Sequence, residues 1–282
     1  MDRYPYLLGC LLGTALGDAV GLRREGLNPR RAMRLYGGRP LTPCLVAGRG
    51  FCSDDTEHTQ MVGRALVLSE GDPDRFELEF ARQLKRWLLC CPAGVGLATL
   101  RACWKLLLGY QPTNSGVFSA GNGPAMRSAL LGVYARDETQ LQQLVRRSTR
   151  ITHTDPKAEE AARVVARAAR IRATGQNVSP AEFIAGEASR LHDQELGRHL
   201  ARCAESLAVG TAPVDFARSL GWADGISGYI NQTVPAALFC WASHPNSLQD
   251  SVEDAVMLGG DTDSVAAITG AICAANLGST CV

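Results

Sequence analysis

The sequence predicts an all-α protein, and three observations lead to this fold class. No stretch of useful length alternates polar and apolar residues as a β-strand does, whereas many stretches repeat apolar residues with a helical period. Aromatic residues make up only 6% of the chain while alanine and glycine abound, which suits closely packed helices better than a sandwich or barrel. Neither a solenoid repeat nor a low-complexity linker divides the sequence, so we expect a single domain over residues 1–282.

The first expected helix covers residues 7–22 and carries glycine at every fourth position, at Gly9, Gly13, Gly17 and Gly21. Each glycine inside a helix costs about 1 kcal/mol relative to alanine. Four of them on nearly one face therefore predict that another backbone approaches closely there. We expect this helix to be central and buried nearly all round.

The same N-terminal segment weakly resembles a secretory signal peptide, because Arg3 precedes a short apolar run. Asp2 interrupts the basic region that such a peptide needs, and the apolar run continues smoothly into the following residues. With Asp18 inside it, the run is also too short to span a bilayer. We favour a core helix and expect no membrane partner.

Cap residues and amphipathic spacing predict further helices. Asp72-Pro73-Asp74 opens one of them, and Asp155 followed by Pro156 opens another. Residues 26–50 and the segment from 109 to the next helix are rich in turn-forming residues, so we expect loops there. The expected helices are 55–69, 72–91, 97–108, one starting at 124, 137–154, 155–173, 180–208, 229–241 and 264–276.

Charge and cysteine usage exclude several classes of function. A net charge of +1 offers no general attraction for nucleic acid or an anionic membrane, and the basic runs 85–87 and 167–173 suit solvated helix faces. The ten cysteines include no C-x-x-C pair and follow no regular framework. We therefore predict reduced thiols, a cytoplasmic location and no cysteine zinc site.

Two stretches, "FCSDDTEHTQMVGRAL" at 51–66 and "GGDTDSVAAITGAI" at 259–272, place acids and a hydroxyl where a loop enters an apolar helix. Helix capping is the simpler interpretation, but capping needs one such residue and each stretch has several. Asp261 and Asp263 have no Lys or Arg within ten residues on either side. Clustered acids repel one another unless a cation intervenes, and hard oxygen ligands suit Mg²⁺ or Mn²⁺.

These stretches belong to a series of five motifs, which read in order GxxxGDAxG…E, SDDT, GNGxxMR, THxDP and GGDTDSxAAIxGA. The series runs from about residue 7 to 276 and resembles the ADP-ribosylglycohydrolase family. The resemblance implies an all-α orthogonal helical bundle with a central binuclear Mg²⁺ or Mn²⁺ site. It also implies hydrolysis of the bond between ADP-ribose and a modified acceptor. Many relatives have a proline and a small residue where this chain has Leu22, Arg23 and Arg24.

By resemblance, two oxygen-rich sets hold the metals: Ser53, Asp54 and Asp55, and then Asp261, Asp263 and Ser264. Three carboxylates are the implied catalytic groups. Asp55 or Asp263 would orient or deprotonate the attacking water, and Glu25 would be a gating ligand or a proton carrier near the leaving group.

The remaining substrate contacts are also implied by resemblance. The loop residues Ser119, Gly121, Asn122 and Gly123 would cradle the pyrophosphate or ribose, with Met126 as a wall, although a plain turn is the alternative.

Two side chains beyond that loop complete the implied substrate site. His153 would contact phosphate or ribose, or else be a histidine at a helix entry. Tyr229 would stack on adenine, or be an ordinary core aromatic. His58 is expected to be structural.

We therefore predict a monomeric, metal-dependent hydrolase whose partner is the ADP-ribose moiety of a modified protein, attached to arginine or serine. A small ADP-ribosyl metabolite or an ADP-ribosylated nucleic acid are alternative substrates. A non-catalytic binding or structural member should have lost metal ligands, whereas all six positions here carry oxygen. A different metal-dependent hydrolase, such as a phosphoesterase, would lack the GNGxxMR and THxDP motifs.

Overall fold

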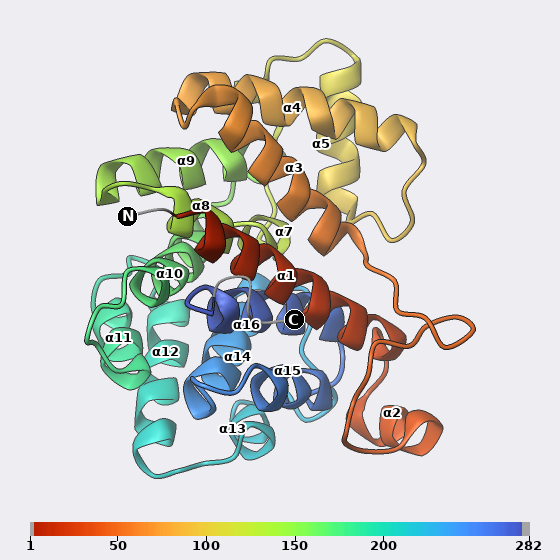
Figure 1. The fold of residues 1–282 in the computed structure, drawn as a ribbon, viewed down its shortest axis with the longest axis vertical. Helices are drawn as coiled ribbons and strands as arrows, with labels where there is room; N and C mark the ends of the chain where they lie inside the picture. Colours follow the sequence, from red (N-terminus) through yellow and green to blue (C-terminus); the bar gives the residue numbers. More distant parts are fainter. Residues whose placement is uncertain (1–2, 278–282) are drawn as a thin grey trace.

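The computed structural model describes residues 3–277, and within them it contains sixteen α-helices, one 3₁₀ turn and no strand (Figure 1). This confirms the predicted all-α fold class. The elements are α1 (Tyr4–Gly21), η1 (Leu22–Arg24), α2 (Pro29–Tyr36), α3 (Asp54–Ser69), α4 (Pro73–Leu89), α5 (Leu97–Leu107), α6 (Pro112–Ser115), α7 (Gly123–Met126), α8 (Ala129–Tyr134), α9 (Glu138–Arg150), α10 (Pro156–Ala173), α11 (Pro180–Ala188), α12 (Gln194–Ala208), α13 (Pro213–Ser219), α14 (Ile230–Ser243), α15 (Leu248–Met257) and α16 (Thr262–Ala274).

Several predicted boundaries were wrong. The single helix expected over 180–208 is two helices, because Asp193 caps the start of α12 with bonds to two backbone amides. The loop expected over 26–50 contains α2, which Asn28 caps and Pro29 begins. The helix expected from residue 124 is divided into α7 and α8, and the short helices α6, α13 and α15 were not predicted.

Helices α1 and α16 lie side by side through the middle of the molecule (Figure 1). The glycines of α1 permit this contact, because a Cβ at Gly13 would lie 2.2 Å from the carbonyl oxygen of Gly270. A Cβ at Gly17 would lie 2.1 Å from the oxygen of Ala266. The close approach of a second backbone, expected from the glycine spacing, is therefore confirmed.

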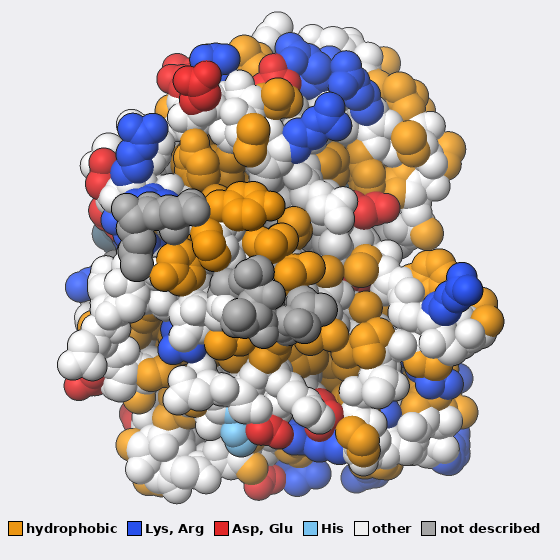
Figure 2. All heavy atoms as spheres, viewed as in Figure 1, with side chains coloured by type: hydrophobic (Ala, Val, Ile, Leu, Met, Phe, Trp, Pro, Cys, Tyr) orange, Lys and Arg blue, Asp and Glu red, His pale blue; other side chains and the backbone are white. Residues whose placement is uncertain are grey.

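Helix α1 is not buried all round, and that part of the expectation was wrong. Its glycine face is buried, whereas leucines on its other faces, such as Leu8, Leu11 and Leu12, are only half-buried. Hydrophobic side chains accordingly gather across the middle of the face shown in Figure 2, over the position of α1 in Figure 1. Among the described residues, Tyr4–Arg24 is the one helical stretch long and apolar enough to cross a membrane. Half of it is buried, and a core helix meets the same criterion.

The rest of the core surrounds this central pair. Helices α3, α4 and α5 lie at one end of the molecule and α12 and α13 at the other (Figure 1). The rings of Phe216 and Phe239 stack 4.1 Å apart and join α13 to α14. The nine cysteines within the described residues are all free thiols, and Cys281 lies outside that range.

Candidate active site

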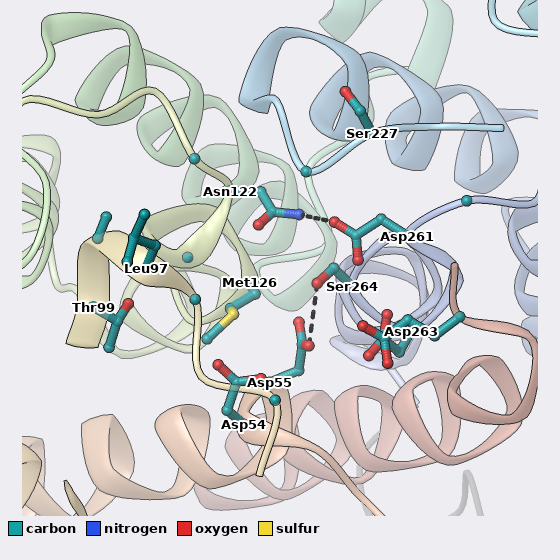
Figure 3. A pocket seen from close by; sticks show the side chains of 18 of the residues that line it. Asp54, Asp55, Leu97, Thr99, Asn122, Met126, Ser227, Asp261, Asp263 and Ser264 are labelled. Carbon is teal, nitrogen blue, oxygen red and sulfur yellow. Dashed lines mark hydrogen bonds between the residues drawn. The ribbon is translucent and has the colours of Figure 1, made fainter. Parts of the chain in front are cut away.

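The first residues of α3 and of α16 meet in space, although about two hundred residues separate them in sequence (Figure 3). The hydroxyl of Ser264 donates a hydrogen bond of 3.1 Å to Oδ2 of Asp55. The hydroxyl of Ser53 donates to the same oxygen, also at 3.1 Å. Both hydroxyls proposed as ligands therefore already point toward one buried carboxylate.

A third acid, Asp18 of α1, holds the start of α3 in this position. Its fully buried carboxylate accepts hydrogen bonds from the backbone amides of Ser53 (2.9 Å) and Thr56 (3.1 Å), and from the hydroxyl of Thr56 (2.5 Å). Free amides at a helix start are natural partners for a carboxylate. Asp18 stands in the GDA motif, but the sequence reasoning assigned it no role. The sequence feature that could have indicated a role for Asp18 is the presence of an acid inside an otherwise apolar, glycine-rich helix.

The two helix starts border a cavity of about 550 Å³, within the range of small-molecule sites. Five carboxylates line it, and no Lys or Arg side chain does so among the described residues. The predicted residues in the lining are Glu25, Asp54, Asp55, Ser119, Gly121, Asn122, Gly123, Met126, His153, Asp261, Asp263 and Ser264.

Burial without a compensating cation makes these acids hard to ionise. Desolvation, then the charges of Asp18, Glu25 and Asp261, raises the pKa of Asp54 to about 7. Desolvation, then the charges of Asp261 and Glu25, raises the pKa of Asp263 to about 9. The pKa of the fully buried Asp55 is raised well above its ordinary value by desolvation and by Asp263.

Glu25 lines the same cavity and interacts with the same acids. Desolvation, followed by the charges of Asp261 and Asp18, raises its pKa. The amide of Gly26 donates to the carbonyl of Gly260 at 2.8 Å, and the amide of Gly260 donates back to Leu27 at 2.8 Å. This pairing fixes Glu25 beside the glycine turn that leads into Asp261.

The donor set fits divalent metal ions in its chemistry. Asp55 Oδ1 and Asp263 Oδ1 are buried oxygens without a hydrogen-bond partner, which is costly unless a cation or proton satisfies them. All the candidate ligands are hard oxygens, as Mg²⁺ and Mn²⁺ prefer. Among residues 3–277, however, no three His, Cys, Asp or Glu side chains converge into a ready-made metal-binding group. The structure therefore shows a shared acidic cavity rather than a closed coordination sphere.

The glycine-rich loop forms the opposite wall of the cavity. Its Asn122 donates a side-chain hydrogen bond of 2.7 Å to Oδ2 of Asp261, which ties the loop to the acidic cluster (Figure 3). The backbone amide of Asn122 donates to Gly228 at 3.0 Å, and that of Ile230 donates to Ala120 at 2.9 Å. The helix after the loop, α7, has only four residues, so its dipole is weaker than the sequence reasoning expected.

The glycines of this loop accommodate a histidine ring. A Cβ at Gly121 would lie 3.1 Å from Nε2 of His153, and one at Gly123 would lie 3.2 Å from Cε1 of the same ring. His153 is buried and lines the cavity, so the structure brings it to the site. His58 lies outside the lining, and its ring centre is 4.5 Å from that of Trp87 in an edge-to-face arrangement, in keeping with a structural role.

Two predicted site residues do not line the cavity. Ser53 caps α3, and its hydroxyl donates a hydrogen bond to Asp55 from outside the cavity lining. Tyr229 precedes α14 and its hydroxyl donates to Glu195 at 2.6 Å and accepts from Lys157 at 2.6 Å. The hydroxyl of Tyr229 thus belongs to a polar cluster beside the cavity, so the geometry does not favour its expected stacking on adenine.

Comparisons with known proteins agree with the motifs and the fold. The family described as ADP-ribosylglycohydrolase matches residues 2–282. The chain belongs to the ADP-ribosylglycohydrolase family. As predicted, it is therefore an enzyme of the ADP-ribosyl glycohydrolase class.

Individual relatives match nearly the whole chain. An uncharacterised protein of Archaeoglobus fulgidus is 32% identical over 93% of this chain and 85% of its own length. The ADP-ribosylhydrolase ARH3 of Gallus gallus is 27% identical over 96% of this chain and 84% of its own length. A solved structure described as an ADP-ribosylglycohydrolase-related protein complex superposes with a TM-score of 0.71. It is 28% identical and covers 100% of this chain and 90% of its own.

Two arginines follow α1 and contact the end of α2. Arg24 is buried and donates to the carbonyl of Gly37 at 2.9 Å, at the end of α2. The guanidinium of Arg23 lies 4.4 Å from the ring centre of Tyr36. The two arginines thus fasten the unpredicted helix α2 to the turn that carries Glu25.

Sequence reasoning also missed part of the lining of this glycohydrolase cavity. Residues 94 and 96–99, just before and at the start of α5, line the cavity. Residues 226–228 line it too, and Gly228 accepts from the amide of Asn122 in the glycine-rich loop. Leu97, Thr99 and Ser227 are labelled in Figure 3. Neither segment carries one of the five motifs. Only a tertiary contact brings these segments to the cavity.

Proposed function

We propose that this glycohydrolase uses two Mg²⁺ or Mn²⁺ ions to hydrolyse the bond between ADP-ribose and a protein side chain, arginine or serine. One observation carries the proposal: the unpartnered oxygens of Asp55 and Asp263 are buried beside a cavity that no Lys or Arg lines among the described residues. Such oxygens need a cation or a proton, and a divalent cation is the partner that would keep both carboxylates ionised.

The proposed metal ligands are the two oxygen-rich sets at the starts of α3 and α16: Ser53, Asp54, Asp55, Asp261, Asp263 and Ser264. When bound, the metals would keep these carboxylates ionised and fix the attacking water and the ribose hydroxyls in register. Asp18 would preserve the position of the first set through its bonds to the amides of α3.

In the proposed reaction, the oxygen of water forms a bond to the anomeric carbon of the ribose as the bond to the acceptor breaks. Asp55 or Asp263 accepts a proton from that water, and neighbouring carboxylates stabilise the oxocarbenium-like transition state. Glu25 donates a proton to the departing nitrogen or oxygen. Its raised pKa supports this role, because an acid that retains its proton nearer neutral pH can donate it.

The surroundings of the cavity support a protein acceptor. Leu97 lines the cavity yet is 61% exposed, and Phe118, 80% exposed, directly precedes the lining residue Ser119. These two side chains give a protein acceptor apolar surface to contact beside the site.

The test is an assay with matched substrates, namely ADP-ribosylated arginine and serine peptides, O-acetyl-ADP-ribose and ADP-ribosylated DNA, each with Mg²⁺, Mn²⁺ or EDTA. We expect turnover of a peptide substrate that EDTA abolishes and that Asp54→Ala or Asp263→Ala reduces by at least 100-fold, the scale of losing a catalytic electrostatic group. Full activity in EDTA would remove the metals from the proposal. Turnover of the DNA or metabolite substrate alone would replace the proposed acceptor.

A further inference from the structure

Arg127, in the GNGxxMR motif, is a buried cation without an acidic hydrogen-bond partner. Its side chain is fully buried, and it donates to the hydroxyl (3.1 Å) and carbonyl (2.8 Å) of Ser148. It also donates to the hydroxyl of Thr152 at 2.7 Å and to Nδ1 of His58 at 3.2 Å. Burial lowers its pKa to about 10, so it stays charged at neutral pH. Burying a charge that has no acidic partner costs free energy of folding. A function of Arg127 in the site would explain why the protein keeps this charge.

The bond from Arg127 occupies one acceptor site of the Thr152 hydroxyl and leaves its single proton for another partner. Since Thr152 Oγ1 accepts from Arg127, its proton is free for Nδ1 of His153 at 2.8 Å or the carbonyl of Thr149 at 3.4 Å. The shorter contact is the stronger hydrogen bond. When the hydroxyl proton is donated along this shorter contact, Nδ1 of His153 accepts it, and the proton of the neutral ring is on Nε2.

Both Arg127 and burial keep the His153 ring neutral. Desolvation, followed by the charge of Arg127, lowers the pKa of His153 to about 3. A neutral ring with its proton on Nε2 has one donor, and Nε2 lies against Gly121, in the lining of the cavity. The ring therefore presents an N–H group where the glycine-rich loop borders the cavity.

The diphosphate of ADP-ribose is an anion, and no Lys or Arg among the described residues lines the cavity to receive it. We propose that Arg127 is a positioning residue for diphosphate recognition: through Thr152 it orients His153 so that Nε2–H donates to the ligand. Behind the ring, the buried guanidinium also supplies a fixed positive potential. This inference rests on the proposed function, since it takes ADP-ribose as the ligand.

His58 provides an internal comparison. Arg127 donates to its Nδ1, so the same reasoning puts the proton of His58 on Nε2. That nitrogen is buried without a partner and lies outside the cavity lining. Arg127 therefore fixes two histidine tautomers, and only the His153 tautomer faces the ligand site.

The first measurement is the tautomer of His153 in the full-length protein, read from its ¹⁵N chemical shifts. We expect the Nε2–H form in the parent and in Thr152→Ser, which keeps the hydroxyl, and a mixture of tautomers in Thr152→Val. The Nδ1–H form in the parent protein overturns the inference, and this result does not depend on whether any variant folds.

The second measurement is ADP-ribose affinity by calorimetry in buffer containing Mg²⁺. We expect Thr152→Val to weaken binding by about 10- to 100-fold, the scale of a hydrogen bond to a charged group, and Thr152→Ser to stay within about threefold of the parent. Equal affinity in the parent and a folded Thr152→Val overturns the inference and leaves the proposed function standing. If the parent does not bind ADP-ribose at all, the proposed function is overturned, and this inference with it.

Discussion

Replacing Asp263 by asparagine should stabilise the metal-free protein, although it removes a proposed metal ligand. Asp263 is 4% exposed, and its Oδ1 has no hydrogen-bond partner. Desolvation and then the charges of Asp261 and Glu25 raise its pKa to about 9, against an ordinary value of 3.8. In chelator the folded protein must therefore keep a proton on Asp263 at neutral pH, whereas the unfolded chain releases it.

The sign and size of the effect follow from proton linkage. Between pH 4 and 9 the folded state binds more protons at this site than the unfolded state, so stability falls as pH rises. At about 1.36 kcal/mol per pH unit, the interval from 3.8 to 7 corresponds to a penalty of roughly 4 kcal/mol. Relaxation around the side chain reduces this upper bound. We expect Asp263→Asn to gain roughly 1–4 kcal/mol at pH 7 in EDTA.

The assay is urea unfolding of both proteins at pH 5, 7 and 8.5, in EDTA and in Mn²⁺. In EDTA, the advantage of Asp263→Asn should grow with pH. In Mn²⁺ it should shrink or reverse, because the parent carboxylate then binds a cation. The control is Asp224→Asn, at an exposed position outside the cavity lining, which should change little in either condition. A variant less stable than the parent in EDTA at pH 7, or a difference independent of pH, would refute the reasoning.

Three other predictions test the packing, the buried histidine and the acceptor surface. Gly17→Ala places a methyl group 2.1 Å from the oxygen of Ala266 and should cost at least about 3 kcal/mol in thermal unfolding. Gly186→Ala in α11 meets nothing within 4 Å and should stabilise by about 0.5–1 kcal/mol; equal effects would contradict the α1–α16 contact. His153 has a folded-state pKa of about 3, so stability should fall by about 1.4 kcal/mol per unit as pH drops below 6.5. In His153→Asn, the fall of the denaturant midpoint with decreasing pH should lose the contribution of His153. An unchanged pH dependence would count against the neutral ring. Leu97→Ser should lower kcat/KM about 5- to 10-fold on an ADP-ribosylated protein but leave it nearly unchanged on ADP-ribosylarginine, as expected for an exposed apolar contact; an equal loss on both substrates would argue against a docking role.

Features that depend on local pattern could be predicted from the amino-acid sequence. The glycine spacing predicted a helix approached by another backbone, and the structure has that contact at Gly13 and Gly17. Cap residues located the starts of α4 and α10 within about one residue, because capping and proline preference act through neighbouring backbone groups. The five motifs together indicated the family, which the family match over residues 2–282 confirms.

The assembly of the site depends on contacts between distant parts of the chain, which no local pattern predicts. The bond from Ser264 to Asp55 spans 209 positions, and no local rule of spacing encodes which distant helix start meets which. The same holds for the capping of α3 by Asp18 of α1, and for the lining segments at 96–99 and 226–228. Short helices such as α2 also depend on tertiary contacts, because a few turns of helix are marginal alone. Helix starts and motifs depend on residues that are neighbours in sequence. The acidic cavity, in contrast, forms because packing around α1 and α16 brings the two halves of the chain together.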